Sequence, residues 1–410
     1  MIDYDKLNTY KENNRIEAKK VAGGLPKSIW ATYSSFANTN GGIILLGVDE
    51  DNDKGLIIAN LENPEKLITD FWNTVNNSNK VSVNILKEKN VQIIEHDGKR
   101  IISIEIPRAE RMDKPVFLNN DIWNAYRRNG EGDYRCPKES VRAMLRDAAI
   151  KTQDMLILEK TPFSAFDYET VKGYRNAMRA VRPNHVWDNL DHDDFLFKLG
   201  AIGRGEDEKL HPTAAGLLMF GFECEIVREY PHFFLDYREQ FDCDLRWTDR
   251  ITSSSGEWSG NLFRFYYKAY NKLIQNPRIK VPFKIEKGYR VDDTPVHKAL
   301  REALANCLIN ADYYGEGGVV IMNHVDRITF ENPGTLRIKI EEAISGGVSN
   351  PRNVVLMKMF NLLDIGERAG SGIPSIFNIW EMQKWENPQI DERFDSLERI
   401  CLTLPIQNST

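Results

Sequence analysis

Three polar side chains recur at four-residue intervals in the segment 294–318, TPVHKALREALANCLINADYYGEGG. On a helix, Glu302, Asn306 and Asn310 would share one face, beside an apolar stripe of Ala, Leu and Cys. The carboxylate could act as a general base, and the amides could hold a metal ion and phosphate groups. The pattern predicts one long helix that ends in a glycine-rich turn and lines a site. An exposed polar helix face explains this segment alone equally well.

Two motifs downstream of this helix suit a nucleotide. A predicted strand leads into an Asn-Pro-Gly turn, and a G-x-x-x-G-x-G loop precedes another predicted helix. A strand end can contact a base, glycines let backbone amides approach phosphates, and a helix N-terminus favours their negative charge. Together with the polar helix face, these motifs predict a nucleotide pocket. The motif residues are Asn332, Gly334, Gly366, Gly370 and Gly372.

The first fifty residues hold a second set of candidate catalytic groups. Glu12, Glu17 and Asp49 are carboxylates at the ends of predicted elements, and could hold one or two divalent ions around a scissile phosphate. Lys19 could neutralise charge in the transition state. In the alternative interpretation, Glu17 and Lys19 form an exposed ion pair on a strand and Asp49 caps a turn.

A basic and aromatic segment follows in the same part of the chain. Arg127, Arg128 and Arg135 lie near Tyr126 and Tyr134 in the sequence. Arginines that bind phosphates, with tyrosines on which bases stack, are typical of a nucleic-acid contact strip. A solvated charged hairpin is the other interpretation of this run.

Composition bounds the class of protein. The 410 residues carry a net charge of −6, so nucleic-acid binding would require a local basic patch. The five cysteines form no CxxC pair, the seven histidines show no metal-ligand spacing, and GxSxG, HExxH and Walker A motifs are absent from the sequence. No apolar run approaches the ~20 residues of a membrane span, and no signal peptide is indicated. We therefore expect a cytoplasmic protein without a membrane partner.

Hydrophobic patterning predicts an α/β (α+β) chain in three parts. Residues 1–150 show helices alternating with strands, with an acidic turn at 49–54 and strands at 81–86, 91–96 and 100–106. Residues 151–222 read as a linker and a helical or winged-helix-like module. Residues 223–410 contain the nucleotide-site motifs and form the third domain.

The C-terminal motifs resemble a known family. REALANCLINADY, ITFENPG and NPRN…GERAGSGI, within roughly 295–380, resemble the GHKL (Bergerat-type) ATP-binding domain, an α/β sandwich, in a divergent bacterial branch. The resemblance implies that Glu302 activates water and Asn306 binds Mg²⁺. Asn332 stands where GHKL enzymes carry the Asp that reads the adenine amino group, and this exchange removes a charge-assisted contact.

The same resemblance places Gly334 directly after the adenine-reading position. It also assigns Gly366, Gly370 and Gly372 to the phosphate lid. Asn310 is placed in the nucleotide site by its spacing from Asn306 on the helix face. Asn310 begins Asn-Ala-Asp-Tyr, where the branch usually has His-Arg-Asp-Tyr, so a basic pair is missing. ATP binding follows from this resemblance, while hydrolysis remains open.

The N-terminal motifs resemble the Schlafen/AlbA-type domain. Glu12-x4-Glu17-x-Lys19, FANTNGG and GIILLGVDE carry the resemblance over 11–51, and it returns at KPVF, YRRNG and PKESVRAML up to about 147. Eukaryotic members of the Schlafen family use a Glu, Glu, Asp set to cleave structured RNA. Many bacterial relatives are described only as DNA-binding or transcriptional regulators. Asp49 is one of three adjacent acids, so its match depends on the register of the turn.

These resemblances imply a nucleic-acid-acting protein that binds ATP. The leading hypothesis is a Mg²⁺- or Mn²⁺-dependent RNase for tRNA or structured RNA, coupled to the GHKL-like domain, in stress or phage defence. The alternative is a non-catalytic, ATP-responsive DNA-binding transcriptional regulator, and a third hypothesis is a scaffold with two degenerate sites. RNA is the favoured partner, DNA is an alternative, and a homo-oligomer is expected.

Overall fold

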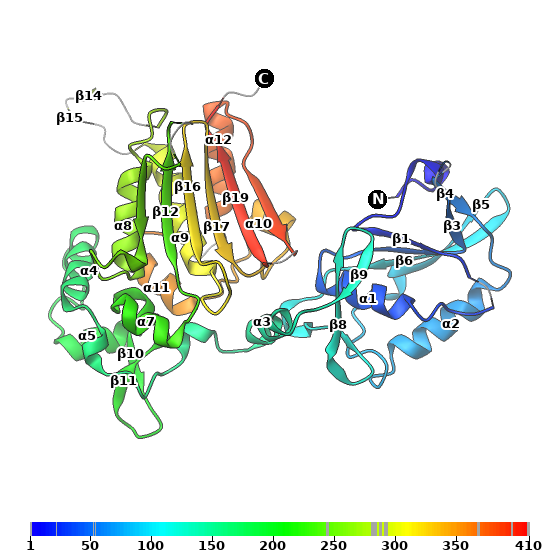
Figure 1. The fold of residues 1–410 in the computed structure, drawn as a ribbon, viewed down its shortest axis with the longest axis horizontal. Coiled ribbons are helices and arrows are strands. Elements are labelled where there is room, and N and C mark those ends of the chain that lie inside the picture. The colour runs from blue at the N-terminus through cyan, green and yellow to red at the C-terminus, as the bar shows by residue number, and fades with distance from the viewer. Residues whose placement is uncertain are drawn as a thin grey trace. The chain divides into compact units, whose positions relative to one another are not determined.

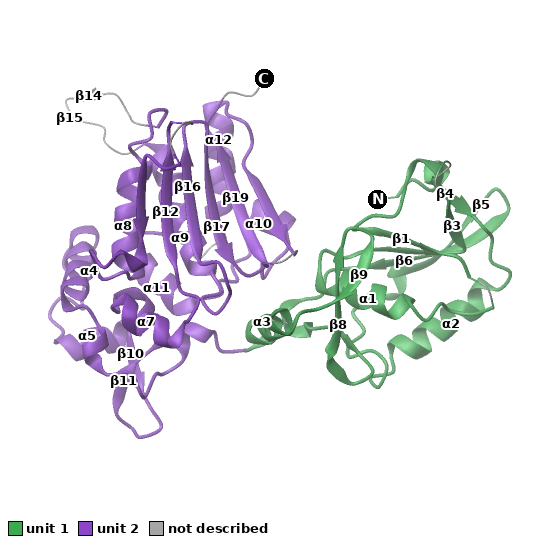
Figure 2. Cartoon of the chain, in the orientation of Figure 1, with its two compact units in different colours: residues 1–149 green, residues 150–410 purple. Residues whose placement is uncertain are grey.

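The computed structural model describes residues 2–407 except 22, 52, 54, 243–245, 280–284, 287–288, 291–293, 367–369 and 395–396. The chain forms two compact units, Met1–Ala149 and Ile150–Thr410 (Figure 2). Both units combine helices with β-sheets, which confirms the α/β class (Figure 1). Among the described helices, none has the length and apolar character needed to cross a membrane.

Unit 1 is built on a four-stranded sheet in the order β1-β2-β6-β5. β1 runs parallel to β2, and the other neighbours are antiparallel. The buried faces of the sheet and of the first two helices form the main core of this unit. The second helix begins where Asn63 accepts a hydrogen bond from the backbone of Lys66 and Pro64 occupies the first turn, which are common helix-start signals. These elements are β1 (Ile16–Lys19), α1 (Ile29–Asn38), β2 (Gly42–Leu46), α2 (Pro64–Val75), β5 (Val91–His96) and β6 (Lys99–Ile106).

The remaining elements of unit 1 flank this sheet. The β3–β4 hairpin replaces the acidic turn that the sequence predicted at 49–54. The predicted strand at 81–86 forms only a single bridge, between Val81 and Leu118. The flanking elements are the 3₁₀ helices η1 (Tyr4–Thr9), η2 (Glu88–Asn90) and η3 (Arg111–Asp113), β3 (Val48–Asp51), β4 (Gly55–Ile58), β7 (Phe117–Leu118), β8 (Asp121–Asn129), β9 (Gly132–Arg135) and α3 (Lys138–Ala148).

Unit 2 is a sandwich of one six-stranded sheet and several helices. The strand order is β13-β12-β16-β17-β19-β18, with only β12 and β16 parallel. α9 packs between α8 and α12 and against β17 (Figure 1). The elements are β12 (Leu235–Gln240), β13 (Asp249–Thr252), α8 (Leu262–Leu273), α9 (Pro295–Asn310), β16 (Val319–His324), β17 (Arg327–Pro333), α10 (Ile340–Ser345), α11 (Val354–Leu362), α12 (Gly372–Gln383), β18 (Gln389–Arg393) and β19 (Arg399–Pro405).

Residues 151–222, predicted as a separate middle module, share one continuous apolar core with the sandwich. The predicted order of helix, short helix and hairpin is present in α4, α5 and β10–β11. The remaining elements of unit 2 are η4 (Gln153–Met155), η5 (Phe163–Ala165), α4 (Tyr168–Val181), α5 (His192–Leu199), β10 (Ile202–Arg204), β11 (Leu210–Pro212), α6 (Ala214–Phe220), α7 (Glu223–Glu229), η6 (Ser253–Ser255), β14 (Ile285–Glu286) and β15 (Tyr289–Arg290).

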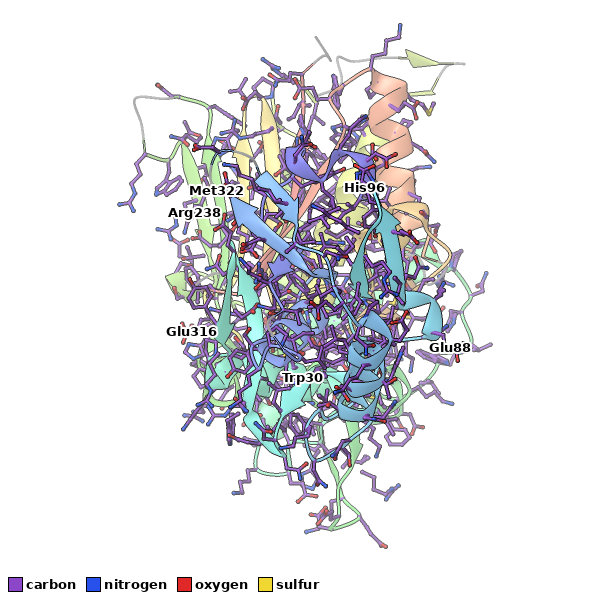
Figure 3. All side chains as sticks on the ribbon, turned by 90° about the vertical axis from the view of Figure 1, so that its right-hand side faces the viewer. Trp30, Glu88, His96, Arg238, Glu316 and Met322 are labelled. Atoms are coloured by element: carbon purple, nitrogen blue, oxygen red, sulfur yellow. The ribbon has the colours of Figure 1, made fainter. Side chains whose placement is uncertain are left out.

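The two faces of the six-stranded sheet differ in chemistry. Tyr237 and Ile321 are register partners on the face that the helices cover, and both are buried. Strand residues alternate between faces, so their neighbours Arg238 and Met322 lie on the other face (Figure 3). There, the buried carboxylate of Asp236 accepts hydrogen bonds from two arginines of the same face. One face therefore holds the helices that build the pocket, and the other is polar.

α9 covers 295–310 of the segment 294–318, and turns follow it, as predicted. It begins at Pro295, where the Thr294 hydroxyl accepts a hydrogen bond from the backbone of His297. It ends at Asn310, because Ala311 has an extended backbone. The structure therefore places the polar face on the last three turns of α9.

A buried carboxylate fastens α11 to the segment that enters unit 2. Asp154 is fully buried, and its Oδ2 accepts hydrogen bonds from the backbone amides of Val355 and Leu356 at 2.7 and 3.0 Å. Burial raises the pKa of Asp154, against the opposing effect of these hydrogen bonds and of the Thr152 hydroxyl. The amides in the first turn of a helix have no acceptor within the helix, and the carboxylate of Asp154 accepts hydrogen bonds from two of them in α11.

Replacing Asp154 with alanine should destabilise unit 2 by about 1–3 kcal/mol, because two buried amides at the start of α11 lose their acceptor. Urea denaturation followed by tryptophan fluorescence measures this loss. Glu381→Ala is the control, because Glu381 is an exposed carboxylate within the helix α12. Equal stability of the two variants would show that the buried contact contributes nothing.

Candidate functional site

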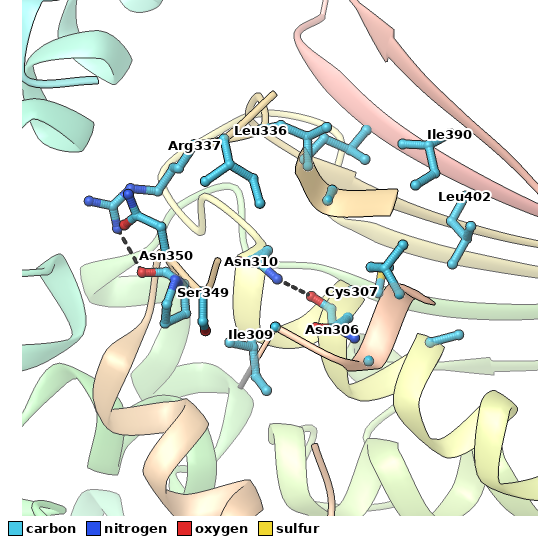
Figure 4. Close-up of a pocket in the computed structure, with 18 of the residues that line it drawn as sticks. Asn306, Cys307, Ile309, Asn310, Leu336, Arg337, Ser349, Asn350, Ile390 and Leu402 are labelled. Atoms are coloured by element: carbon cyan, nitrogen blue, oxygen red, sulfur yellow. Dashed lines mark hydrogen bonds between the residues drawn. The ribbon is translucent and has the colours of Figure 1, made fainter. Parts of the chain in front are cut away.

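One pocket in unit 2 collects polar residues from three separate segments (Figure 4). Glu302, Asn306 and Asn310 line it from α9, as the sequence predicted. Asn332 lines it from the end of β17, and Gly370 and Gly372 from the segment that enters α12. The pocket has about 950 Å³ of empty space, including its open mouth.

Apolar side chains make up most of the remaining wall. On the sheet side of the pocket they are Phe330, Ile390, Ile400 and Leu402. A flat apolar wall beside a few fixed polar groups is a common design for binding an aromatic base. Further apolar lining comes from Ala303, Cys307, Ile309, Leu336, Ile338, Ala343, Val348, Pro351, Met357 and Ile373.

Glu302 lies against the first turn of α12. The Nδ2 of Asn306 donates to its Oε1 at 3.0 Å. A Cβ atom on Gly372 would lie only 1.9 Å from the same oxygen, so any larger residue would displace the carboxylate. The glycine therefore allows a carboxylate and the N-terminus of α12 to share one side of the pocket.

Asn332 lines the pocket, and its side-chain nitrogen is held by the backbone. Its Nδ2 donates to the backbone oxygens of Asn310 and Pro333, at 3.4 and 3.2 Å. Two carbonyl oxygens can only accept hydrogen bonds, so the amide must direct its nitrogen toward them. An aspartate at 332 would put a negative charge against the same two oxygens. The asparagine at 332, in place of the family's aspartate, thus fits the surrounding backbone oxygens and leaves its Oδ1 as a possible acceptor.

The NPRN motif caps the C-terminus of α9. The side chain of Arg352 donates to the backbone oxygens of Asn310 and of Thr335, the latter at 2.7 Å. The Nδ2 of Asn353 donates to the oxygens of Ile309 and Ala311 at 2.9 and 2.8 Å. Carbonyls at a helix end otherwise have no intrahelical partners. Sequence reasoning missed these roles, because the partners lie about forty residues apart.

The predicted glycines have different roles. Gly334 has a φ of 96°, and a Cβ atom there would lie 2.6 Å from the Arg352 guanidinium, so this glycine makes room for the cap and is not among the pocket-lining residues. Gly366 also has a positive φ, of 75°, and is not a lining residue. The intervening residues 367–369 of the predicted loop lie outside the described residues. Gly370 and Gly372 thus carry the part of the phosphate-lid prediction that the structure places at the pocket.

In unit 1, the side chain of Glu17 is enclosed by cations. Its Oε1 lies 2.6 Å from Lys19 Nζ and its Oε2 lies 2.7 Å from a nitrogen of Arg128. Arg128 also pairs with Asp133 at 3.0 Å, and Asp133 accepts hydrogen bonds from the hydroxyls of Thr32 and Ser35. Glu17 is 8% exposed and Arg128 4% exposed. The Glu17–Lys19 pair is therefore part of a buried network that joins β1, α1 and β8–β9, not an exposed ion pair.

The three predicted carboxylates do not gather around one point. Glu12 accepts a hydrogen bond from the backbone of Ala18, and burial raises the pKa of its carboxyl, with repulsion from Glu17 and Glu50 adding to the shift. Asp49 instead pairs with Lys20, whose hydrogen bond and charge lower the pKa of Asp49. Across the described residues, no group of three His, Cys, Asp or Glu side chains could hold a metal ion.

The predicted arginine strip is split by the geometry of its strands. Arg127 and Arg128 are consecutive on β8 and so point to opposite faces. Arg127 approaches Ser140 of α3, whereas Arg128 is buried in the Glu17 network. Arg135 is exposed on β9 and donates to Asn124. The prediction that Arg128 belongs to a nucleic-acid contact strip is therefore wrong, since its side chain is covered.

Replacing Arg128 with alanine should destabilise unit 1 by about 3–5 kcal/mol, because Glu17 and Asp133 would be left as uncompensated buried charges. Arg135→Ala, an exposed position on the neighbouring strand, should change stability by less than about 0.5 kcal/mol. Thermal and urea unfolding followed by circular dichroism measure both. If the two variants unfolded alike, the buried network would not hold unit 1 together.

The sequence matches three protein families. Residues 12–137 match "Schlafen, AlbA_2" and residues 317–401 match "Putative ATP-dependent DNA helicase recG C-terminal", the HATPase_c_4 family. Residues 142–236 match a domain of unknown function, DUF8451. No curated protein matches the chain at a significant level.

Two solved structures are similar to parts of the chain. The DIP2311 protein from Corynebacterium diphtheriae is 14% identical with a TM-score of 0.46; the match covers 96% of this chain, which spans 64% of that structure's length. The N-terminal domain of a RecG-related protein from Nitrosomonas europaea is 31% identical with a TM-score of 0.25, covering 32% of this chain and 90% of that domain. The family matches fall on the two units that hold the buried network and the pocket. The chain therefore combines an N-terminal Schlafen AlbA_2 domain with a C-terminal recG-type HATPase_c_4 domain.

Proposed function

We propose that this protein binds ATP in the pocket of unit 2 and nucleic acid on unit 1. The observation that carries the proposal is the convergence of α9, β17 and the start of α12 on one pocket. The residues that converge there are the ones the GHKL resemblance assigns to adenine, Mg²⁺ and the phosphates. The pairing of a Schlafen AlbA_2 domain with a recG-type C-terminal domain supports a nucleic-acid-related role.

The pocket offers adenine a selective acceptor. The Oδ1 of Asn332 is the free oxygen of an amide whose nitrogen is held by two backbone carbonyls. It can accept a hydrogen bond from the exocyclic amine of adenine, whereas guanine presents an acceptor oxygen at that position. Phe330 and Leu402 supply the apolar wall for the ring.

Asn306 fits the role of a Mg²⁺ ligand for the bound nucleotide. Its Nδ2 is engaged by Glu302, so its carbonyl oxygen is the atom left for a hard cation. Bound Mg²⁺ would supply charge neutralisation at the phosphates. The carboxylate of Glu302 would be the group that accepts a proton from an attacking water, if hydrolysis occurs.

ATP should bind the wild-type protein more tightly than GTP, and Asn332→Leu should weaken ATP binding at least about tenfold, because a buried hydrogen-bond acceptor for the base is lost. Isothermal titration calorimetry measures both affinities. Asn73→Leu, on an exposed face of α2, is the control substitution. The absence of ATP binding by the wild type, or equal binding of ATP and GTP, would contradict the proposal.

Nucleic-acid binding is assigned to unit 1 by charge and exposure. Tyr134 of β9 is 57% exposed, and its register partner on β8 is Arg127, so the two side chains share one face of the hairpin. An exposed tyrosine next to an arginine can stack on a base and contact a phosphate. In unit 2, the β10–β11 hairpin instead carries Glu206, Asp207 and Glu208 at its tip, a charge that repels phosphates. This hairpin is therefore a poor candidate for a DNA-binding wing.

A metal-dependent RNase is the second candidate function. It is favoured by the proximity of Glu12 to Glu17 and Lys19, which the electrostatic coupling among the three groups indicates. It is disfavoured by the pairing of both Glu17 oxygens with cations and by the separate pairing of Asp49. The geometry of unit 1 thus supports binding better than metal-assisted cleavage.

Wild-type protein should bind tRNA or single-stranded RNA and leave both intact in Mn²⁺. Gel electrophoresis of labelled RNA detects cleavage, and fluorescence anisotropy detects binding. Tyr134→Ala with Arg127→Ala should weaken binding at least about tenfold, because a stacking contact and a phosphate contact on one face of the hairpin are both removed. RNA cleavage that is lost in Glu17→Gln would instead establish the RNase.

A further inference from the structure

We propose that Arg337 is the side chain that recognises the phosphate chain of the nucleotide, and so makes the pocket bind nucleotides better than nucleosides. The proposal rests on the proposed ATP site and names a residue that the sequence motifs do not include. Arg337 lies in the loop between β17 and α10 and lines the pocket.

Charge balance in the pocket singles out this arginine. Of the described residues that line the pocket, Glu302 and Arg337 alone carry a formal charge. The triphosphate of ATP is strongly anionic, and Glu302 has the wrong sign to attract it. Among these lining residues, Arg337 is thus the group able to offset the phosphate charge directly.

The guanidinium of Arg337 is anchored at the rim of the pocket. One of its terminal nitrogens donates to the backbone oxygen of Pro351 at 2.7 Å, and the side chain is half-buried. Figure 4 shows it beside Ser349 and Asn350, on the side of the pocket away from Ile390. The rim formed by Arg337, Ser349 and Asn350 carries polar side chains, whereas the wall at Ile390 is apolar and suits a base.

The rim also adjoins the glycine segment that enters α12. The backbone amide of Gly347 donates to the oxygen of Gly370 at 3.3 Å. A Cβ atom on Gly370 would lie 2.4 Å from the oxygen of Val348, so these two loops are in backbone contact. Arg337 is anchored on the same loop, through Pro351. Phosphates held at the start of α12 would therefore lie at the rim that Arg337 borders.

The chemistry of the side chain suits this role. A guanidinium donates two parallel hydrogen bonds to phosphate oxygens and stays charged at any physiological pH. A contact with a charged phosphate is stronger than one with a neutral hydroxyl, so the effect of Arg337 should rise with the number of phosphates. Because adenosine lacks phosphates, its affinity should not depend on this residue.

The test compares ATP, ADP and adenosine binding by isothermal titration in wild type, Arg337→Gln and Arg337→Lys. Arg337→Gln should lower the affinity for ATP and ADP at least about tenfold, the change expected when a hydrogen bond to a charged group is lost. It should leave the affinity for adenosine within about twofold of the wild-type value. Arg337→Lys should keep part of the ATP affinity that Arg337→Gln loses. Lysine has the positive charge but not the planar guanidinium that donates two parallel hydrogen bonds.

The controls separate this inference from the ATP proposal. If wild-type protein binds neither ATP nor adenosine, the proposed ATP site fails. If wild type binds ATP and Arg337→Gln binds it equally well, only the role of Arg337 is overturned. An equal loss of ATP and adenosine affinity would also overturn it, since the substitution would then act through the Pro351 contact. Thermal unfolding of each variant shows whether that loop remains folded.

Discussion

The capped C-terminus of α9 is the contact on which the pocket depends. Arg352 and Asn353 bind the last carbonyl oxygens of this helix, and Arg352 also binds the backbone just beyond Gly334. Helix-end carbonyls that are buried without partners cost free energy, so the cap fixes where α9 stops. It thereby sets the positions of Asn310 and Asn332, which are bonded to each other through the same helix end. Asn332, the end of α9 and the loop that carries Arg352 are thus joined by hydrogen bonds.

The two units use buried polar groups in opposite ways. In unit 1, both carboxylate oxygens of Glu17 pair with cations, one with Lys19 and the other with Arg128, inside a buried network. In unit 2, the side-chain nitrogen of Asn332 is held by two backbone oxygens, and the residue lines an open pocket. A saturated group holds elements together, whereas a half-saturated group beside a cavity is prepared for a ligand.

The sequence predicted what depends on local spacing and missed what depends on distant partners. The polar face of α9 was predictable because residues four apart share a helix face, and Asn332 because a strand ends beside it. The sequence did not reveal that Arg128 is covered. Its burial depends on the alternation of β8 and on Glu17, which lies more than a hundred residues away in the chain. The place of Asp49 in the predicted metal triad depends on the fold of 48–58, which the structure shows as a hairpin with Asp49 in β3 and paired with Lys20. Arg337 carries no motif, so only the pocket reveals it.

The central claim is that ATP binds between α9, β17 and the start of α12. Amide hydrogen exchange with and without ATP and Mg²⁺ tests it without any substitution, because ligand binding slows local opening of the segments it contacts. The account predicts slower exchange in 302–310, 346–353 and 372–378, and unchanged exchange in the β1–β2 strands of unit 1. Unchanged exchange throughout unit 2, or protection confined to segments away from the pocket, would contradict it.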